Sequence, residues 1–341
     1  MNWTSHFELD PGFLNTASLG VPPRGAFAER SVVLAAWERG QLAANDFDSY
    51  VNRARSAWAQ ISMVDTKNVA IGATVSGMVG LVAASLPDDS KVLIASGDFT
   101  SLTFPFLAQT GRRVSVKEVL LTELIDSIDD SVALVAVSSV QSADGRIIDV
   151  DDLVRHAARH GTKILLDTTQ SCGWLPIDCS RVDYAVCGGY KWLLSPRGVA
   201  FMSVLPELLD ELVPHSAGWY AGEDIWASIY GSPLRLSRHA RRLDTSPAWF
   251  SWVGAAEALE FLAQIDASEI HKHNVNLANS LLTALDLPKQ DSAIITLDRP
   301  DAPERLKLAG IRTAIRAGKV RASFHLYNNE DDVELAYNAL K

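Results

Sequence analysis

Short runs of β-branched and other apolar residues alternate with longer amphipathic stretches along the middle of this chain, and this alternation most constrains its fold. Several runs are apolar at consecutive positions, as in strands that are covered on both faces. Strands are predicted at residues 91–96, 113–119, 131–140, 162–169, 183–189 and 198–204. Helices are predicted between them near residues 76–86, 103–110, 149–160 and 206–213. The pattern predicts an α/β architecture, with a largely parallel sheet and helices on both faces.

The two ends of the chain have a different pattern. Helices are predicted at residues 23–43, 49–61, 246–265, 269–285 and 330–340, and strands at 292–298, 311–316 and 320–327. The last two strands are joined by the turn AGK, which predicts an antiparallel hairpin. We therefore expect a large domain over residues 22–255 and a small α+β domain built from residues 1–21 and 256–341.

Composition argues against several classes of function. With 41 acidic and 31 basic residues, the net charge is −10, which argues against nucleic acid or an anionic membrane as the main partner. No apolar run approaches the roughly 18 residues of a membrane-spanning helix. The first residues lack the basic and apolar stretches of a secretory signal. Three cysteines without metal-like spacing predict reduced thiols, no metal site and a cytoplasmic location.

Two charged residues follow predicted strands near the centre of the chain. Asp167 closes the run KILLD, and Lys191 comes 24 residues later, just after another apolar run. Ligands bind outside the carboxyl ends of strands in open parallel sheets, so both side chains could open onto one edge. A helix cap or turn is the simpler interpretation of Asp167 alone. The alternative is a carboxylate aimed at a cationic ring nitrogen, with Gln170 adding a hydrogen bond in the same pocket.

A lysine in such a place has a recognised use. Partial burial favours its neutral, nucleophilic amine, which forms a Schiff base with a carbonyl. With pyridoxal 5'-phosphate, the lysine holds the cofactor and a carboxylate keeps the pyridine nitrogen protonated. Lys191 and Asp167 together indicate this cofactor. A nicotinamide dehydrogenase is disfavoured, because no Gly-x-Gly-x-x-Gly follows a strand.

Residues 183–202, DYAVCGGYKWLLSPRGVAFM, resemble the lysine signature of the class V aminotransferases. Tyr190 stands where that family usually has histidine; kynureninases also carry tyrosine there, in contact with the cofactor phosphate. The resemblance extends over most of the chain. It implies the pyridoxal-phosphate transferase fold type I, with a mainly parallel seven-stranded sheet in the large domain plus a smaller α+β domain. It makes Lys191 the catalytic residue and Asp167 a cofactor ligand.

Further cofactor contacts follow from matching family positions one at a time. Residues 69–86 resemble the phosphate-binding turn, with Ala73 and Thr74 at a helix start whose N–H groups favour a phosphate. Phe99 takes the place of the aromatic residue that stacks on the cofactor ring. A simple helix start and a core phenylalanine are the plainer interpretations. The stretch AVSSVQ resembles the strand end that reaches the cofactor's phenolic oxygen, through Ser139 or Gln141.

The C-terminal part of the chain carries most information about the substrate. Arg321, in VRASFHLYNN, matches the family arginine that binds the substrate α-carboxylate, a task that suits a guanidinium fork. A surface arginine on a strand is the plainer alternative. Residues 13–24 resemble the segment of isopenicillin N epimerase-like members that runs over the active-site entrance, with Asn15 and Ser18 as candidate substrate contacts. The resemblance implies an amino acid or a close analogue as substrate.

Family members are commonly homodimers with the active site at the interface, and the resemblance implies a homodimer here. A threonine in a Gly-Thr-Pro run of the family reaches the phosphate bound by the partner. Here the run is DTSP, so Thr245 or Ser246 is expected in that role, and Ser246 is our candidate. The aromatic stretch at residues 218–220 is either an active-site wall shared across the dimer or an ordinary turn.

The reaction is less constrained than the cofactor, because the cofactor carries the hard chemistry. We expect an aminotransferase-like enzyme that acts on an amino acid through a Schiff base on Lys191. A lyase, kynureninase-like or of the C–S type, and an epimerase are the alternatives. A non-catalytic binding module is less favoured, because Lys191, Asp167 and Arg321 are all present. Cysteine desulfurases use a cysteine shortly before the carboxylate-binding arginine, and no cysteine follows Cys187.

Overall fold

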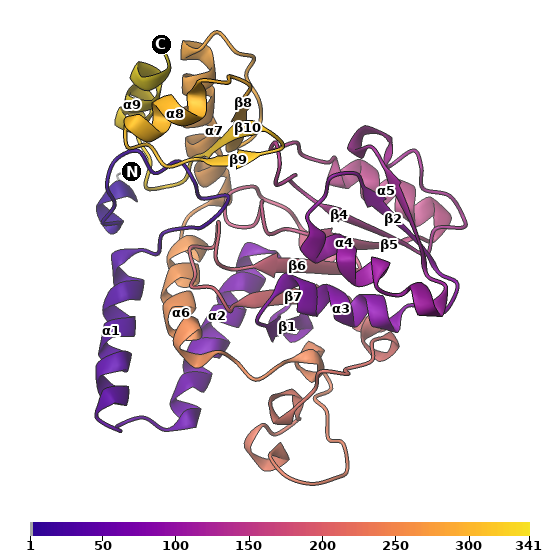
Figure 1. Ribbon diagram of the computed structural model, residues 1–341. Helices are drawn as coiled ribbons and strands as arrows, with labels where there is room; N and C mark the ends of the chain where they lie inside the picture. The colour runs from indigo at the N-terminus through magenta and orange to yellow at the C-terminus, as the bar shows by residue number, and fades with distance from the viewer. Residues whose placement is uncertain (1–2) are drawn as a thin grey trace.

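A seven-stranded sheet lies at the centre of the computed structural model, which describes residues 3–341 (Figure 1). Its strand order is β1-β7-β6-β5-β4-β2-β3. Neighbours from β6 to β3 pair in parallel, whereas β7 runs antiparallel to both β6 and β1. The predicted, mainly parallel seven-stranded sheet is confirmed. The strands are β1 (Val69–Gly72), β2 (Lys91–Ala95), β3 (Ser115–Val119), β4 (Leu134–Ser138), β5 (Lys163–Asp167), β6 (Tyr184–Gly188) and β7 (Ala200–Val204).

Helices cover both faces of this sheet. On β4, Leu134 and Ala136 pack into the core under α3 and α4, and Val135 and Val137 pack into the opposite core with α5. Successive strand residues point to opposite faces, so a strand that is buried twice is apolar throughout. Helices α2 and α6 cover the second face beside β1 and β7. The helices of this unit are α1 (Arg24–Glu38), α2 (Asp48–Ile61), α3 (Val75–Ser85), α4 (Thr100–Leu107), α5 (Val150–His160) and α6 (Trp249–Ala263).

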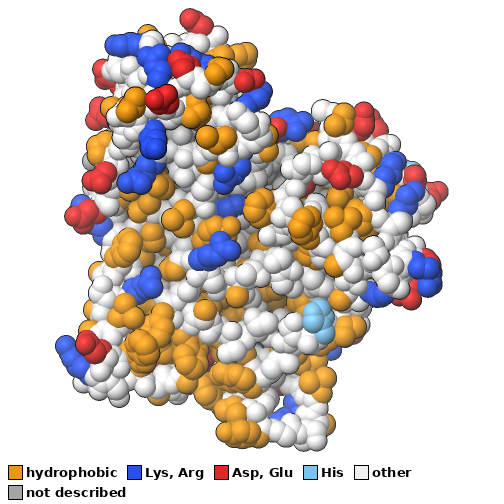
Figure 2. All heavy atoms as spheres, viewed as in Figure 1, with side chains coloured by type: hydrophobic (Ala, Val, Ile, Leu, Met, Phe, Trp, Pro, Cys, Tyr) orange, Lys and Arg blue, Asp and Glu red, His pale blue; other side chains and the backbone are white. Residues whose placement is uncertain are grey.

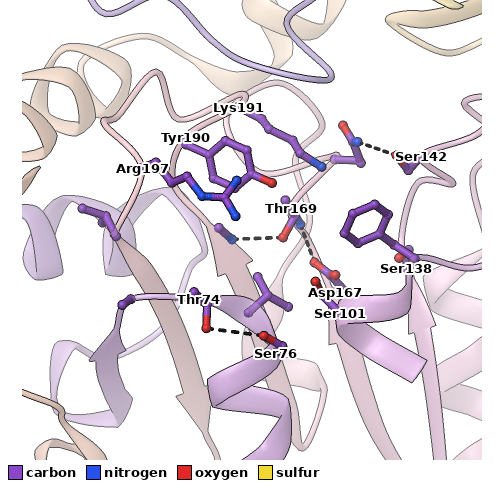
Figure 3. Close-up of a pocket in the computed structure, with 16 residues that line it drawn as sticks. Thr74, Ser76, Ser101, Ser138, Ser142, Asp167, Thr169, Tyr190, Lys191 and Arg197 are labelled. Atoms are coloured by element: carbon purple, nitrogen blue, oxygen red, sulfur yellow. Dashed lines mark hydrogen bonds between the residues drawn. The ribbon is translucent and has the colours of Figure 1, made fainter. Parts of the chain in front are cut away.

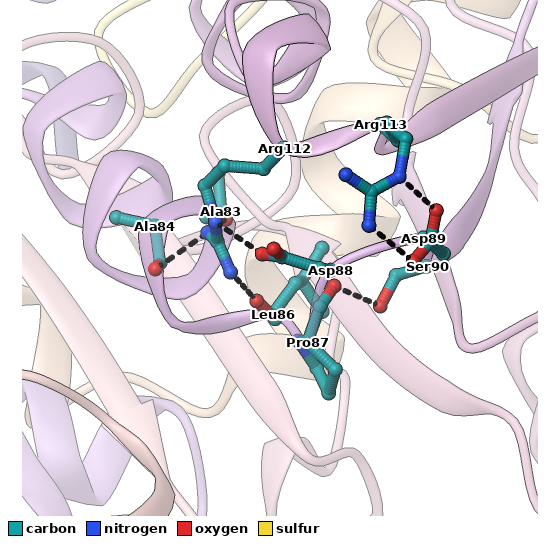
Figure 4. Close-up of polar contacts among 9 residues, drawn as sticks. All are labelled: Ala83, Ala84, Leu86, Pro87, Asp88, Asp89, Ser90, Arg112 and Arg113. Carbon is teal, nitrogen blue, oxygen red and sulfur yellow. Dashed lines mark hydrogen bonds and ion pairs between the residues drawn. The ribbon is translucent and has the colours of Figure 1, made fainter.

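Both ends of α3 are held by side chains. At its C-terminal end, Arg112 Nη1 donates to the Ala84 carbonyl at 2.7 Å, Nη2 donates to the Leu86 carbonyl, and Nε pairs with Asp88 at 3.0 Å (Figure 4). The last carbonyl groups of a helix have no hydrogen-bond donors within the helix, and the Arg112 guanidinium supplies donors here. At the other end, the Thr74 hydroxyl accepts a backbone N–H of the first turn. The N-terminus of α3 is thereby fixed at the edge of the sheet.

A second, three-stranded antiparallel sheet lies above the first in Figure 1, in the order β8-β10-β9. Its elements are β8 (Ile294–Leu297), β9 (Ala314–Arg316), β10 (Lys319–Ser323), α7 (Ala267–Ala284), α8 (Ala302–Leu308) and α9 (Glu330–Leu340). The predicted hairpin is confirmed as β9–β10. The N-terminal segment joins this unit, because Leu14 N–H donates to the Arg312 carbonyl at 2.9 Å and Ser323 N–H to the Leu14 carbonyl at 3.0 Å.

The expected domain boundary at residue 255 falls inside α6, and residues 1–2 of the expected small domain lie outside the described residues. The division into residues 22–255 and 1–21 with 256–341 stays a prediction.

Three elements differ from the sequence-based expectation. Residues 206–213, expected as an α-helix, form the 3-10 helix η7 (Pro206–Glu211), which has no side-chain cap and is too short to be a stable α-helix. The strand expected at 320–327 ends at Ser323, because Asn328 Oδ1 accepts the His325 N–H at 2.9 Å and closes a turn. Helix α8 lies outside the expected elements.

Short 3-10 helices connect the longer elements. They are η1 (Trp3–His6), η2 (Ala44–Phe47), η3 (Thr66–Asn68), η4 (Thr110–Arg112), η5 (Leu121–Glu123), η6 (Cys179–Arg181), η8 (Trp219–Ala221), η9 (Trp226–Ser228) and η10 (Ala240–Leu243). Within residues 3–341, none of the helices combines the length and the apolar character that a membrane crossing requires.

Candidate active site

A pocket opens at the carboxyl ends of the central strands (Figure 3). Asp167 is the last residue of β5, Lys191 follows β6, and Thr74 directly precedes α3. Such an edge is where open parallel sheets bind ligands. Most of the residues predicted to bind the cofactor line this one pocket, namely Ala73, Thr74, Phe99, Asp167, Gln170, Tyr190 and Lys191.

Lys191 is a buried amine that points into the pocket. Its side chain reaches between two rings, with Nζ 5.2 Å from the centre of the Phe99 ring and 5.6 Å from that of Tyr190. Burial lowers the pKa of Lys191 to about 8, against the opposing influence of the Asp167 charge. His325 Nε2 donates to the Trp192 carbonyl at 2.9 Å and so fixes the backbone of the loop that carries Lys191. Near neutral pH, a useful fraction of the Lys191 amine is therefore neutral and nucleophilic.

Asp167 is a buried carboxyl group at the end of β5. Its Oδ1 accepts the Thr169 backbone N–H at 2.8 Å. Burial raises the pKa of Asp167 to about 6, although the hydrogen bonds from Thr169 act in the opposite direction. A cationic group placed against this carboxyl would favour its ionised form. The site therefore suits a protonated ring nitrogen.

Phe99 is held at the pocket wall by a neighbouring carboxylate. Asp98 Oδ1 accepts the Phe99 N–H at 2.7 Å and the Ser138 hydroxyl at 2.5 Å, while Oδ2 accepts the Ser138 N–H at 2.8 Å and Gln141 Nε2 at 3.2 Å. The Phe99 side chain is 42% exposed, so it is not a core residue. Its ring lies beside the Lys191 amine. Sequence reasoning missed Asp98, although it follows β2 at the same edge where Asp167 follows β5.

One end of the pocket is suited to an anion. Thr74 and Ser76 place hydroxyls at the N-terminus of α3, where Ser76 donates to Thr74 at 3.4 Å. Figure 3 shows the Arg197 guanidinium above these hydroxyls and beside Tyr190, and its Cζ lies 4.9 Å from the Tyr190 ring centre. Within the described chain, Arg197 forms no ion pair. Sequence reasoning missed it, although the arginine in SPRG follows Lys191 closely. A cation, hydroxyls and a helix N-terminus together favour a phosphate.

Arg321 is a buried guanidinium without a counter-ion. Its side chain is 1% exposed. Nη1 donates to the Ser142 carbonyl and, at 3.1 Å, to its hydroxyl, and Nη2 donates to the Ser18 hydroxyl at 2.7 Å. Nε has no hydrogen-bond partner, and no acidic side chain of residues 3–341 pairs with Arg321. Burial lowers the pKa of Arg321 to about 10. A buried cation with only neutral partners is suited to an anionic ligand.

Gln170 and Asn15 have structural surroundings that the sequence did not indicate. Gln170 lines the pocket, but its Nε2 donates to the Ala17 carbonyl and the Ser142 hydroxyl, both at 3.0 Å, and its Oε1 accepts Trp192 Nε1 at 2.8 Å. Gln170 thus fastens the N-terminal segment to the lysine loop. Asn15 is absent from the pocket lining, and its buried Oδ1 has no hydrogen-bond partner. Their predicted contacts with cofactor and substrate stay predictions.

Other candidate residues lie away from this pocket. Ser139 bonds the Ser171 hydroxyl at 2.7 Å inside the core. Tyr220 donates to Asp48 at 2.9 Å, in the segment that extends below the large sheet in Figure 1. Ser246 is exposed. The roles expected of Ser246 and of residues 218–220 involve a second subunit, and they stay predictions.

The donor set fits the predicted pyridoxal phosphate. Lys191 would supply an amine for its aldehyde, Asp167 a carboxyl group for its ring nitrogen, Phe99 a flat face for its ring, and Thr74 with Arg197 donors for its phosphate. Among the described residues, no group of three or more His, Cys, Asp or Glu side chains could hold a metal ion. The arrangement can hold a carbonyl compound beside a base. Arg321 is not among the residues that line this pocket, although it donates to Ser142, which is, and its predicted contact with the substrate carboxylate stays a prediction.

The chain is similar to known proteins over most of its length. The family model described as aminotransferase class-V matches residues 106–301. An uncharacterized aminotransferase of Bacillus subtilis (strain 168), YcbU, is 29% identical over 84% of this chain and 82% of its own. Isopenicillin N epimerase of Streptomyces clavuligerus is 28% identical over 87% of this chain and 79% of its own. A solved structure of a C-DES mutant with glycine covalently linked to the PLP cofactor has a TM-score of 0.86 and 19% identity, covering 97% of this chain and 96% of that one.

Proposed function

The chain belongs to the aminotransferase class-V family, and from that premise we propose that it transfers the amino group of an amino acid to a keto acid. It is a pyridoxal-phosphate-dependent enzyme that acts on amino acids. When bound, pyridoxal phosphate withdraws electrons from the α-carbon of the substrate amine. The remaining work falls to side chains of the pocket, and each can be assigned a task from its surroundings.

Four parts of the pocket would hold the cofactor. Lys191 Nζ would bind its carbonyl carbon, and Asp167 would keep its ring nitrogen protonated. Phe99 would cover one face of the ring. Thr74, the first N–H groups of α3 and Arg197 would hold the phosphate. This distribution uses the anion-binding end of the pocket for the phosphate and leaves the side facing Arg321 for the substrate.

Lys191 also supplies the acid–base group. It is the one amine among the residues that line the pocket in the described chain, and its pKa of about 8 lies near neutral pH. General bases work best with a pKa near the operating pH. With cofactor and substrate bound, Lys191 Nζ would take the proton that leaves the substrate α-carbon.

The proposal that the substrate is an amino acid rests on the buried Arg321. Its guanidinium has hydroxyl and carbonyl partners but no acidic one, so a carboxylate would supply the missing counter-charge. A substrate held at Arg321 through its α-carboxylate presents its amino group toward Lys191. Since Arg321 lies on β10 and Lys191 after β6, the substrate would bridge the two sheets.

Inversion at the α-carbon is the second candidate, favoured by the 28% identity to an isopenicillin N epimerase. Inversion needs a group that moves a proton on each face of the α-carbon, and Lys191 would be the group on one face. A lyase that uses a cysteine before Arg321 is disfavoured, because the β9–β10 connection is Ala317–Gly318 and no cysteine follows Cys187. We therefore rank amino transfer first.

We also propose a cytoplasmic homodimer. Large apolar side chains are exposed on the single chain, among them Trp37 on α1 (59%) and Tyr230 (87%) and Leu234 (77%) on the segment below the large sheet. Figure 2 shows hydrophobic side chains gathered over the lower part of this face. Coverage by a second copy would remove this surface from water. Ser246 lies on the same stretch of chain and would then be free to approach the partner's phosphate. Light scattering of the purified protein tests the dimer.

The test of the reaction uses the cofactor-loaded enzyme. Borohydride should fix the cofactor to the peptide that contains Lys191, and Lys191→Ala should abolish this labelling while surface variant Lys117→Ala keeps it. An amino acid should then convert the visible band to that of the aminated cofactor and release a keto acid. Inverted amino acid without keto acid would instead support the epimerase. Labelling that persists in Lys191→Ala would refute the assignment of the lysine.

A further inference from the structure

A second guanidinium lies on the same face of the small sheet as Arg321. In the β9–β10 hairpin, Arg321 pairs with Ala314 and Lys319 pairs with Arg316. Residues two apart on a strand share a face, and so do residues directly opposite on antiparallel strands. Arg316 therefore projects from the face that carries Arg321. In Figure 1, β9 is the strand of the small sheet nearest the large unit.

Arg316 lines a second cleft, separate from the Lys191 pocket. Residues 143–147 of the large unit form one wall of this cleft, and Thr296, Arg316 and Lys319 form the other. The preceding residue, Ser142, lines the Lys191 pocket and receives hydrogen bonds from Arg321. The cleft wall thus begins at Ala143, one residue after Ser142, which lies next to the expected α-carboxylate site. A substrate held there would direct its side chain toward either the pocket or this cleft.

Among the charged residues that line the cleft in the described chain, Arg316 alone has no counter-ion. Asp291, which also lines the cleft, lies 3.2 Å from His271 Nε2. Arg146 pairs with Asp144 at 2.8 Å, and Lys319 pairs with Asp298 at 2.8 Å. Arg316 forms no ion pair within residues 3–341, and Nη1 donates only to the Ile315 carbonyl at 2.8 Å. Figure 2 shows basic side chains in the middle of this face, between the two units.

The Arg316 charge reaches the active site. Burial is the main cause of the lowered pKa values of Arg321 and Lys191, and the charge of Arg316 lowers both further. This mutual repulsion is unfavourable in the free protein, and an anion between the guanidinium groups would relieve it.

We propose that Arg316 binds a carboxylate on the substrate side chain, so that the enzyme acts on dicarboxylic amino acids. The inference rests on the proposed function, which supplies the α-carboxylate at Arg321. A guanidinium fork is suited to each of the two carboxylates. Arg321, which is buried, fixes the end common to all amino acids, and Arg316, which is exposed, selects the side chain.

Equilibrium binding to the cofactor-loaded enzyme tests this assignment without turnover. The probes are the dicarboxylates succinate, glutarate and adipate, compared with propionate and butyrate, and the readout is the change in the visible cofactor band. We expect a dicarboxylate to bind at least tenfold more tightly than a monocarboxylate. Arg316→Gln should remove about tenfold or more of dicarboxylate affinity, the order of one charge-assisted pair, and leave monocarboxylate binding unchanged. Arg312→Gln, an exposed change of equal charge outside the cleft, should leave both unchanged.

Each other outcome has a distinct meaning. Equal binding of the two acid classes by the unaltered enzyme would overturn the role of Arg316 while leaving amino-acid chemistry in place. An equal loss in Arg316→Gln and Arg312→Gln would also overturn it, because the effect would then be the general field. Failure of every carboxylate to perturb the cofactor band would count against the α-carboxylate site at Arg321, and therefore against the proposed function itself.

Discussion

The backbone N–H of Gly20 donates to the carbonyl oxygen of Tyr190 at 2.9 Å, which lays the N-terminal segment directly against the backbone of Lys191. A β-carbon on residue 20 would lie 1.9 Å from the Lys191 carbonyl oxygen. Glycine is needed wherever two backbones approach this closely. Because Ser18 of the same segment bonds Arg321 at 2.7 Å, this contact connects the lysine loop to the expected carboxylate site.

Gly20→Ala should therefore disturb the site as well as the fold. The clash involves backbone atoms, so the segment or the lysine loop must shift. We expect unfolding to become easier by about 1–3 kcal/mol, as for other overpacked positions, and cofactor affinity to fall. Urea unfolding and cofactor titration measure the two effects. Gly111→Ala is the control, because a β-carbon there meets no atom within 4 Å. Equal behaviour of the two variants would contradict the close approach.

The lowered pKa of Lys191 makes both the stability and the reactivity of the protein depend on pH. Its pKa is about 8 in the folded chain, against the ordinary lysine value of 10.5 that holds in the unfolded chain. Between these values the unfolded chain binds one more proton, so the contribution of Lys191 to the free energy of unfolding rises with pH across this window.

In the cofactor-free protein, the rate at which Lys191 captures a carbonyl compound should also rise with pH, with a midpoint near pH 8. Stopped-flow absorbance with pyridoxal as the carbonyl compound measures it.

Asp167→Asn should move that midpoint. The negative charge of Asp167 holds the pKa of Lys191 up against burial, so its removal should shift the midpoint of carbonyl capture to lower pH. The same variant should bind cofactor and lose most turnover, because the ring nitrogen loses its carboxylate partner. A midpoint that moved to higher pH would contradict the assigned interaction, and near-normal turnover would contradict the role of Asp167.

How much of the fold the sequence predicts depends on burial. The central strands are buried on both faces, so runs such as the one that ends in Asp167 are clear in the sequence. The family resemblance adds the mainly parallel seven-stranded sheet, whereas the strand order comes from the structure alone. Helix α8 carries local signals of its own, with Pro303 at its first turn and Gly310 beyond its end. It is only seven residues long, and short elements that depend on tertiary packing give weak patterns.

The predicted site residues divide by the range of their contacts. Asp167, Lys191 and Phe99 follow the ends of β5, β6 and β2 in the sequence, so the motifs around them suffice to place them at one edge of the sheet. Gln170 behaves differently, because its amide bonds the Ala17 carbonyl and Trp192 across long stretches of sequence, and no local pattern reveals such partners. Arg197 was missed because nothing in SPRG shows that its guanidinium lies over the Tyr190 ring.

Arg197→Gln tests the anion-binding end of the pocket. The guanidinium lies with the hydroxyls of Thr74 and Ser76 at the N-terminus of α3, so its loss should weaken binding of the phosphate group specifically. We expect affinity for pyridoxal phosphate to fall about 10- to 100-fold, the order of a charge-assisted hydrogen bond, with affinity for unphosphorylated pyridoxal unchanged. Surface variant Arg159→Gln controls for charge. Parallel losses for both forms of the cofactor would argue against a phosphate contact.

Arg321→Gln tests the expected α-carboxylate site. Glutamine removes a buried charge whose hydrogen-bond partners are all neutral, so folding should be preserved. Amino-acid affinity should fall about 10- to 100-fold for every side chain, with cofactor affinity unchanged. Titration of the visible band with an amino acid and with free cofactor separates the two. Amino-acid affinity that survives in this variant would exclude the role of Arg321.

The ion pair between Arg55 and Asp244 should be costly to break. Both side chains are buried, at 4% and 0% exposure, and join at 2.6 Å. Asp244 Oδ1 also accepts the Ile71 N–H at 2.8 Å, and Arg55 donates to the Val69 carbonyl at 2.6 Å. The pair therefore fixes β1, which leads into the turn at Thr74 that we expect to bind the phosphate.

Asp244→Ala should leave the Arg55 guanidinium buried and uncompensated, at a cost of about 3–5 kcal/mol in the free energy of unfolding. Because β1 would loosen, cofactor affinity should fall as well. Replacing both partners, in Arg55→Met with Asp244→Ala, should recover part of the loss, since no unpaired charge remains. Asp210→Ala, which breaks the exposed pair with Arg242, should change stability little. Urea unfolding of the four proteins decides. A double variant less stable than Asp244→Ala would show that Arg55 stabilises the fold even without its partner, through its bond to the Val69 carbonyl, and would contradict the cost assigned to the unpaired charge.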